Sequence, residues 1–68
     1  MPILTVNGES RESAAATVAA LLDEENVPRD AKGVAVALNG ALVRRAEWGA
    51  TALSAGDTVE IVKPFSGG

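Results

Sequence analysis

Two Asn-Gly dipeptides constrain the fold of this chain more than any other feature. Asn7-Gly8 follows the aliphatic run 2–6, and Asn39-Gly40 follows a second aliphatic run, 34–38. Asparagine followed by glycine tolerates the positive φ angles of a type I′ turn, which joins two antiparallel strands by the shortest connection. The sequence therefore predicts two β-hairpins.

The strands of these hairpins differ in polarity. The first return strand, 9–13, is polar and charged throughout, which is typical of an edge strand that must not recruit other chains. The run 34–38 is apolar on both faces and predicts an interior strand, with 41–43 as its return strand. After the turn cluster 54–57, the alternating residues 58–62 predict a last, half-buried strand.

One helix is predicted between the hairpins. The apolar spacing changes from that of a strand to that of a helix, with Val18, Leu21 and Leu22 on one stripe. Thr17 can cap the first turn through its side-chain oxygen. Pro28 biases the preceding residue away from helical angles, so the helix ends no later than that residue.

These elements occur in the order ββαβ(β)β. If the last strand pairs parallel beside the first, one mixed sheet of four to five strands can bury the apolar stripe of the crossing helix. That α+β arrangement is the β-grasp, or ubiquitin-like, roll. A chain of 68 residues suffices for one domain and hardly more. We therefore expect a single domain over residues 1–68, with 65–68 as a flexible C-terminal tail.

Composition excludes several classes of partner. A formal net charge of −3 with six Lys and Arg residues argues against binding of nucleic acid, which depends on clustered basic side chains. No apolar run approaches the ~20 residues of a membrane helix, and no signal segment is visible. We expect a cytoplasmic protein with neither a membrane nor a nucleic-acid partner.

Catalysis by side chains is difficult to build from this sequence. The chain has no His and no Cys, and a Ser or Lys nucleophile would need a base held beside it in a pocket. The acidic run Asp23-Glu24-Glu25 is typical of a solvated helix face rather than of a metal site. We therefore expect no enzyme activity, no metal and no bound cofactor.

The C-terminal sequence Ser66-Gly67-Gly68 is the remaining candidate for chemistry. Without Cβ atoms, two glycines can enter a narrow channel and present a carboxylate to the active site of another protein. The alternative is a frayed end without a role. Ordering such a tail costs entropy, so the folded body must offer a docking surface. The candidate docking residues are Phe65, Leu42, Val43, Arg44, Arg45 and Trp48.

Two of these candidates have alternative roles. Trp48, the only tryptophan, is either a cap over one end of the core or an anchor for a partner. Arg44-Arg45 is either ordinary surface or a basic pair that positions a carboxylate-bearing partner.

Several short segments carry a further signal through their order and spacing. They are Val6-Asn7-Gly8-Glu9, 17–22, 34–40, Arg45-Ala46-Glu47-Trp48, 53–61 and Gly67-Gly68. Together they resemble the ThiS family, the sulfur carriers of thiazole formation in thiamine biosynthesis. The chain departs from the family at Arg44, where a proline is often found, and at Pro64-Phe65, which is unusual before the tail.

The resemblance implies a reaction cycle that is carried out by partners. An E1-like adenylyltransferase uses ATP and Mg to convert the Gly68 carboxylate into an acyl adenylate. Sulfur from a cysteine desulfurase or a rhodanese-like donor then replaces AMP and leaves a thiocarboxylate, which donates its sulfur to thiazole synthase. Gly67 and Ser66 are the residues that must enter the partner's channel. The carrier is a co-substrate in this cycle.

Three alternatives remain open at this point. The same carrier chemistry occurs in molybdopterin formation and in tRNA thiolation. A ubiquitin-like modifier would instead join Gly68 to lysine side chains of target proteins. A β-grasp module that reads RNA or a protein would not need Gly67 and Gly68.

Overall fold

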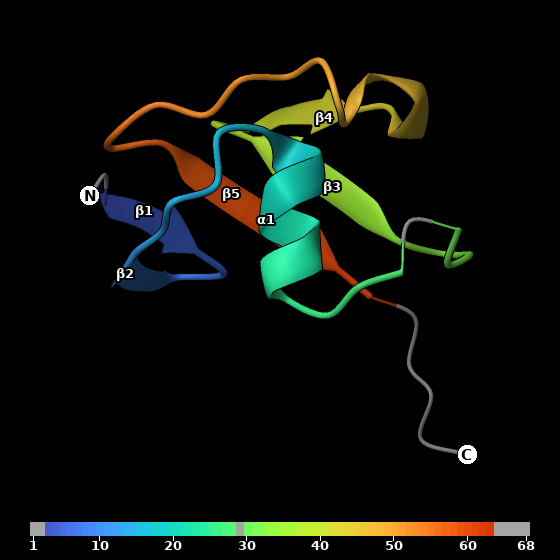
Figure 1. Cartoon of the computed structure of the whole chain (residues 1–68), viewed down its shortest axis with the longest axis horizontal. Coiled ribbons are helices and arrows are strands. Elements are labelled where there is room, and N and C mark those ends of the chain that lie inside the picture. Colours follow the sequence, from blue (N-terminus) through green and yellow to red (C-terminus); the bar gives the residue numbers. More distant parts are fainter. Residues whose placement is uncertain (1–2, 29, 64–68) are drawn as a thin grey trace.

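A computed structural model describes residues 3–28 and 30–63, in which a five-stranded mixed sheet is crossed by one helix (Figure 1). The strand order in the sheet is β2-β1-β5-β3-β4. This is the α+β β-grasp arrangement that the sequence predicts. The elements are β1 (Ile3–Val6), β2 (Glu9–Glu12), α1 (Val18–Glu24), β3 (Ala35–Leu38), β4 (Ala41–Val43), a short 3₁₀ helix (Arg45–Glu47) and β5 (Thr58–Val62).

Both predicted hairpins are present. Asn7 and Gly8 have φ angles of 51° and 84°, and Asn39 and Gly40 have φ angles of 51° and 86°, as a type I′ turn requires. The strands on either side of each turn are antiparallel. The return strands β2 and β4 form the two edges of the sheet.

The last strand, β5, lies at the centre of the sheet. It pairs parallel with β1, through Thr5 with Thr58 and Val6 with Val59, and antiparallel with β3 on its other side. The parallel pairing joins the two ends of the described chain. It confirms the topology on which the β-grasp prediction depends.

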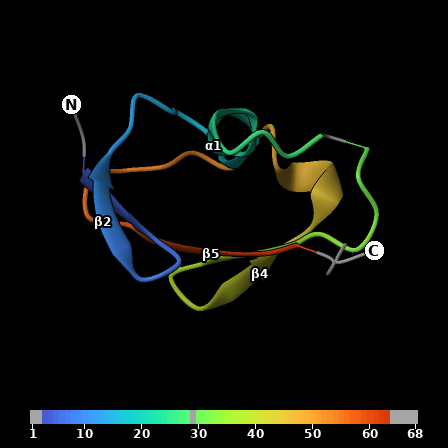
Figure 2. The same cartoon turned by 90° about the horizontal axis from the view of Figure 1, so that it is seen from below.

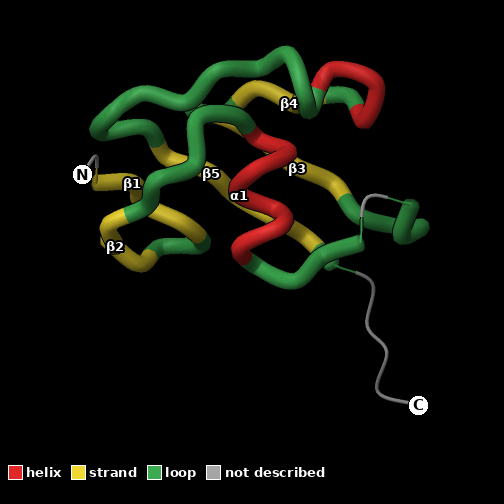
Figure 3. The backbone as a smooth tube through the Cα atoms, in the orientation of Figure 1, coloured by secondary structure: helices red, strands yellow, loops and turns green. Residues whose placement is uncertain are grey.

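Helix α1 begins where the sequence predicts. Thr17 is its N-cap, and the Thr17 Oγ1 atom accepts a hydrogen bond from the backbone N–H of Ala20 at 3.1 Å. The Ala19 N–H donates to the Trp48 carbonyl at 3.0 Å. The free donors of the first turn are therefore satisfied partly by the cap and partly by the connection before β5, which Figure 3 shows as a long loop.

The helix ends at Glu24, before the limit set by the proline. Asn26 adopts a left-handed conformation with φ of 60°, and its N–H donates to the Asp23 carbonyl at 3.1 Å. The Val27 N–H donates to the Leu22 carbonyl at 2.9 Å, and Val27 is buried. These two bonds are the pattern of a Schellman motif, which closes the helix without any contribution from the proline.

The hydrophobic core lies between one face of the sheet and α1 (Figure 2). Every second residue of the inner strands points to this covered face, as the period of a strand requires. The helix contributes its apolar stripe from above. The core side chains from the sheet are Leu4, Val6, Val36, Val43, Val59 and Ile61, and those from α1 are Val18, Ala19, Leu21 and Leu22.

Two strand bounds differ from the prediction by one residue. β2 ends at Glu12, and the buried Ser13 that follows is bonded through its side chain: its Oγ atom donates to Glu24 Oε1 at 2.8 Å and accepts from the Ala15 N–H at 3.1 Å. β3 begins at Ala35 rather than Val34.

Among the described residues, no helix is both long and apolar enough to span a membrane.

Candidate functional site

The predicted reacting group and its tail lie outside the described residues. Gly68, Gly67, Ser66 and Phe65 all follow Lys63, where the described part of the chain stops. The structural question is therefore what surface the folded body presents near the end of β5.

The face of the sheet opposite α1 is uncovered by the described residues. Ala37 of β3 pairs with Leu42 of β4 on one side and with Glu60 of β5 on the other, so these three side chains share this open face. Ala35 pairs with Val62 one step further along. We call the surface formed by Ala35, Ala37, Leu42, Glu60 and Val62 the open face.

The open face carries two large, exposed aliphatic side chains. Leu42 is 72% exposed and Val62 is 61% exposed. Leu42 was predicted as a docking residue and Val62 was not. The signal for Val62 was present in the alternation of β5: its neighbour Ile61 points to the core, so Val62 is an apolar residue at a position that faces away from it.

Val43, another candidate for docking, belongs to the core. It follows Leu42 in β4 and is 8% exposed, because successive side chains of a strand point to opposite faces. The surface available to a partner on β4 is therefore that of Leu42.

Trp48 also belongs to the core. It is 3% exposed, and its indole Nε1 donates a hydrogen bond to the Val43 carbonyl at 3.0 Å. Of the two roles considered for this residue, the cap over one end of the core is the one observed. Its ring surface is not accessible to a partner in this conformation.

The two arginines of the candidate basic pair differ in their surroundings. The Arg45 guanidinium lies over the Trp48 ring, 4.7 Å from its centroid, and donates a hydrogen bond to the Ala31 carbonyl. Arg45 thus joins the chain after α1 to the 3₁₀ helix. Arg44 precedes that helix, and both arginines are exposed, so the difference between them is that the Arg45 side chain is held by Trp48 and Ala31.

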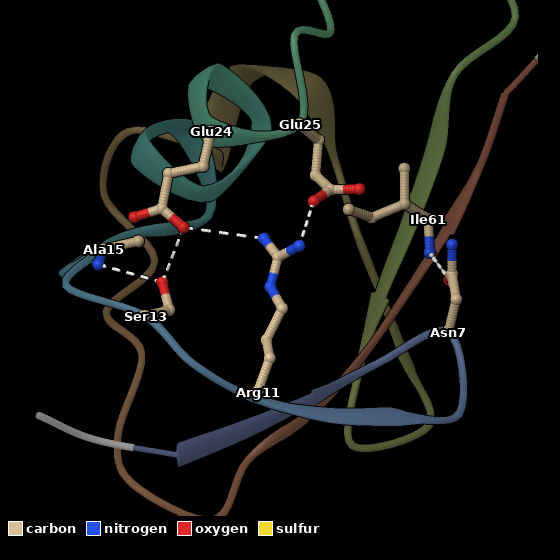
Figure 4. A network of polar contacts seen from close by, with 7 residues as sticks. All are labelled: Asn7, Arg11, Ser13, Ala15, Glu24, Glu25 and Ile61. Atoms are coloured by element: carbon tan, nitrogen blue, oxygen red, sulfur yellow. Dashed lines mark hydrogen bonds and ion pairs between the residues drawn. The ribbon is translucent and has the colours of Figure 1, made fainter.

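The acidic end of α1 is linked to the edge strand β2. Arg11 forms an ion pair with Glu25 and a longer one with Glu24, at 3.5 Å. Glu24 also accepts the Ser13 hydroxyl described above, and Figure 4 shows these contacts together. Glu24 and Glu25 are therefore engaged with Arg11 of β2, which holds the edge strand against the end of the helix.

Each Asn-Gly turn is also bonded to β5 through its asparagine side chain. Asn7 Oδ1 accepts from the Ile61 N–H at 2.7 Å (Figure 4), and Asn39 Oδ1 accepts from the Thr58 N–H at 2.9 Å. Asn39 Nδ2 further donates to Asp57 Oδ1 at 3.1 Å. The two turns thus bond β5 at two different places, one at its start and one near its end.

The Asp57 carboxylate closes the turn that leads into β5. Its Oδ2 atom accepts from the Ser54 N–H at 2.7 Å. This backbone hydrogen bond, with that from the Asn39 side chain, lowers the pKa of the exposed Asp57 carboxyl below its ordinary value.

Among residues 3–28 and 30–63, no three His, Cys, Asp or Glu side chains are grouped to hold a metal ion, and no pocket is found.

Comparison with known protein families shows which family this sequence and fold belong to. The ThiS family model matches residues 4–68, nearly the whole chain, including the terminal glycines. The chain belongs to the ThiS family. No curated protein matches the sequence.

Two solved structures similar to this ThiS-family chain are of a thiamine biosynthesis protein from Geobacter metallireducens. The crystal structure is 36% identical in sequence, with a TM-score of 0.76, over 97% of this chain and 99% of that one. The solution structure is also 36% identical, with a TM-score of 0.78, over 97% of this chain and 87% of that one. These similarities confirm the family resemblance and the fold.

Proposed function

We propose that this protein is the sulfur carrier for thiazole formation in thiamine biosynthesis and that Gly68 bears the sulfur. Membership in the ThiS family supports the carrier role, and the match over residues 4–68 is the single observation that carries the proposal. The similar solved structures, described as a thiamine biosynthesis protein, support the choice of pathway.

The chemistry requires activation because a carboxylate is a poor electrophile. An oxygen of the Gly68 carboxylate attacks the α-phosphorus of Mg-ATP on an E1-like adenylyltransferase, and pyrophosphate leaves. A persulfide from a desulfurase or a rhodanese-like protein then attacks the acyl carbon and displaces AMP. A thiol cleaves the S–S bond of the resulting acyl disulfide, which leaves the Gly68 thiocarboxylate to donate sulfur to thiazole synthase.

The carrier contributes the substrate group and a docking surface, and its partners contribute the catalysis. Its sequence contains no His and no Cys for acid-base or nucleophilic work. We assign ATP and Mg to the adenylyltransferase, propose that the carrier binds no cofactor of its own, and place the reaction in the cytoplasm.

We assign the docking of the adenylyltransferase to the open face. Leu42 and Val62 expose aliphatic surface that a partner can desolvate, and such contacts supply the free energy needed to order the tail. Val62 is also the last residue of β5, next to the start of the segment that enters the partner. Arg44 lies beside β4 and is exposed, so it can contribute charge at the rim.

The test is to incubate the protein with the adenylyltransferase of its own host, Mg-ATP and a sulfur source, and to follow it by intact-protein mass spectrometry. We expect one oxygen atom to be exchanged for sulfur at Gly68. Deletion of Gly68 should abolish the exchange and leave the circular dichroism spectrum and melting temperature unchanged, because the tail lies beyond the described core.

Other outcomes would identify other functions. An unchanged mass in the complete mixture would contradict the carrier role. Slowly migrating conjugates in extracts of the host would favour a protein modifier. Sulfur loading followed by delivery to molybdopterin or tRNA, with none to thiazole synthase, would keep the carrier chemistry and move it to another pathway.

A further inference from the structure

The parallel pairing of β1 with β5 ends at the Asn7-Gly8 turn. Within this pair, the Asn7 N–H donates to the Val59 carbonyl at 2.9 Å. In a regular parallel ladder the carbonyl of the same residue accepts the next bond, here from the N–H of Ile61. Asn7 has left the strand conformation, with φ of 51°, so its backbone carbonyl does not continue the ladder.

The Asn7 side chain takes the place of that missing carbonyl. Its Oδ1 atom accepts from the Ile61 N–H at 2.7 Å, across 54 positions of sequence (Figure 4). The ladder between β1 and β5 thereby gains one rung beyond the end of β1. Without it, the buried Ile61 residue would have a backbone N–H that has lost its acceptor.

This rung lies close to the point where the chain leaves the sheet. Ile61 is buried, and on the side of β3 the pairs Val36 with Ile61 and Ala35 with Val62 continue to the end of β5. Ile61 is therefore bonded to Asn7 on the β1 side of the strand and lies opposite Val36 on the β3 side, and at Val62 the described pairing is with β3. The Asn7 bond is the last described attachment of β5 on its β1 side.

We propose that Asn7 is a positioning residue for the reaction of the C-terminal segment. By holding the β1 side of β5 at Ile61, opposite the side that pairs with β3, it sets the direction in which the residues after Val62 leave the body while the open face is docked. This inference rests on the proposed function, since it concerns the approach of Gly68 to the partner's active site. Reacting groups tolerate little misplacement, so a change at this attachment should alter turnover more than binding.

The Asn39-Gly40 turn provides a matched control. Asn39 has the same φ of 51° and is likewise followed by glycine, and its Oδ1 atom also accepts from a β5 backbone N–H. That N–H belongs to Thr58, at the start of the strand and away from the exit of the chain. Replacing either asparagine by glycine keeps the turn conformation and removes the side-chain acceptor.

The experiment measures ATP–pyrophosphate exchange by the adenylyltransferase with wild type, Asn7→Gly, Asn7→Asp and Asn39→Gly as the carrier. We expect Asn7→Gly to lower kcat by roughly three- to tenfold with little change in KM, as for a misaligned reacting group. Asn7→Asp keeps an oxygen acceptor and should retain wild-type kcat. Asn39→Gly should lower the melting temperature without lowering kcat.

Amide hydrogen exchange gives a readout that does not need the partner. The Ile61 N–H should lose protection in Asn7→Gly, keep it in Asn7→Asp and keep it in Asn39→Gly. Equal losses of kcat in Asn7→Gly and Asn39→Gly would mean that the Asn7 bond acts only by stabilising the fold, and would overturn the proposal. Unchanged kcat in Asn7→Gly, with active wild type, would overturn this inference alone, whereas inactive wild type would overturn the proposed function as well.

Discussion

The two faces of the sheet are built from alternate residues of the same strands, and they differ in what covers them. In β5, Val59 and Ile61 lie under α1, whereas Val62 lies on the open face. All three are aliphatic. Apolar surface stabilises a fold by about 25 cal/mol for each Å² removed from water, so the same kind of side chain contributes to stability on one face and not on the other.

This difference assigns separate work to the two faces. The covered face holds the domain together, and the open face is left with apolar area that a partner can cover. Exposed Leu42 in β4 follows the same rule, with buried Val43 beside it. If the assignment is correct, substitutions on the two faces should separate stability from partner binding.

The largest effect is expected on the covered side. Leu21 of α1 is fully buried, so Leu21→Ala should lower the free energy of unfolding by about 2–5 kcal/mol through a core cavity. Leu42→Ala removes the same atoms from the open face and should change it by less than about 0.5 kcal/mol. Urea unfolding of both variants measures the difference. Equal losses would break the comparison, because they would mean that the open face is packed.

On the open face, substitutions are expected to weaken partner binding rather than stability, and by a smaller free energy. Leu42→Ser and Val62→Ser should each raise the KM of the adenylyltransferase for the carrier roughly fivefold, which corresponds to about 1 kcal/mol of lost contact. Their melting temperatures should stay close to that of wild type. The measurement is initial-rate kinetics at varied carrier concentration.

Ala50→Ser is a matched control for these two variants. Ala50 is exposed and lies in the connection whose carbonyls bond the first turn of α1, so it is remote from the open face. We expect its KM to equal that of wild type. A KM that rises in this variant and not in the open-face variants would move the docking surface to the helical side.

Local sequence signals predicted most of the fold because they depend on few neighbours. Each Asn-Gly turn is specified by the backbone angles of two residues, and the start of α1 by the Thr17 side chain. The end of α1 was harder to predict, because the helix is stopped by the left-handed Asn26 and not by the proline. Asparagine is known to adopt this conformation just after helices, so this end could have been predicted from the sequence.

Features of the site that depend on tertiary contact were harder to predict. Trp48 is buried because it joins the core formed by α1 and the sheet, whose residues are distant from it in sequence, and its carbonyl accepts from the Ala19 N–H. The same holds for Asn7, whose partner Ile61 is distant in sequence. The exposure of Val62 could have been deduced from alternation, provided that the covered face of β5 was assigned first.

The smallest effect is expected from the charge of Asp57, which lies in the turn before β5 and on neither face of the sheet. The hydrogen bonds from Ser54 and Asn39 lower the pKa of Asp57 in the folded state, so its ionised form stabilises the fold at pH values above the ordinary pKa of the group. That stability is lost as the pH falls through the lowered value. Asp57→Asn keeps an oxygen acceptor without the charge, and it should melt slightly below wild type at neutral pH. The gap should close in acid, because the wild-type carboxyl is then protonated. Glu60→Gln, which also removes one negative charge from this region, controls for net charge. A gap that persists or widens as the pH falls would show that Asp57 acts through its shape alone, and the start of β5 would then be held, like the covered face, without help from charge.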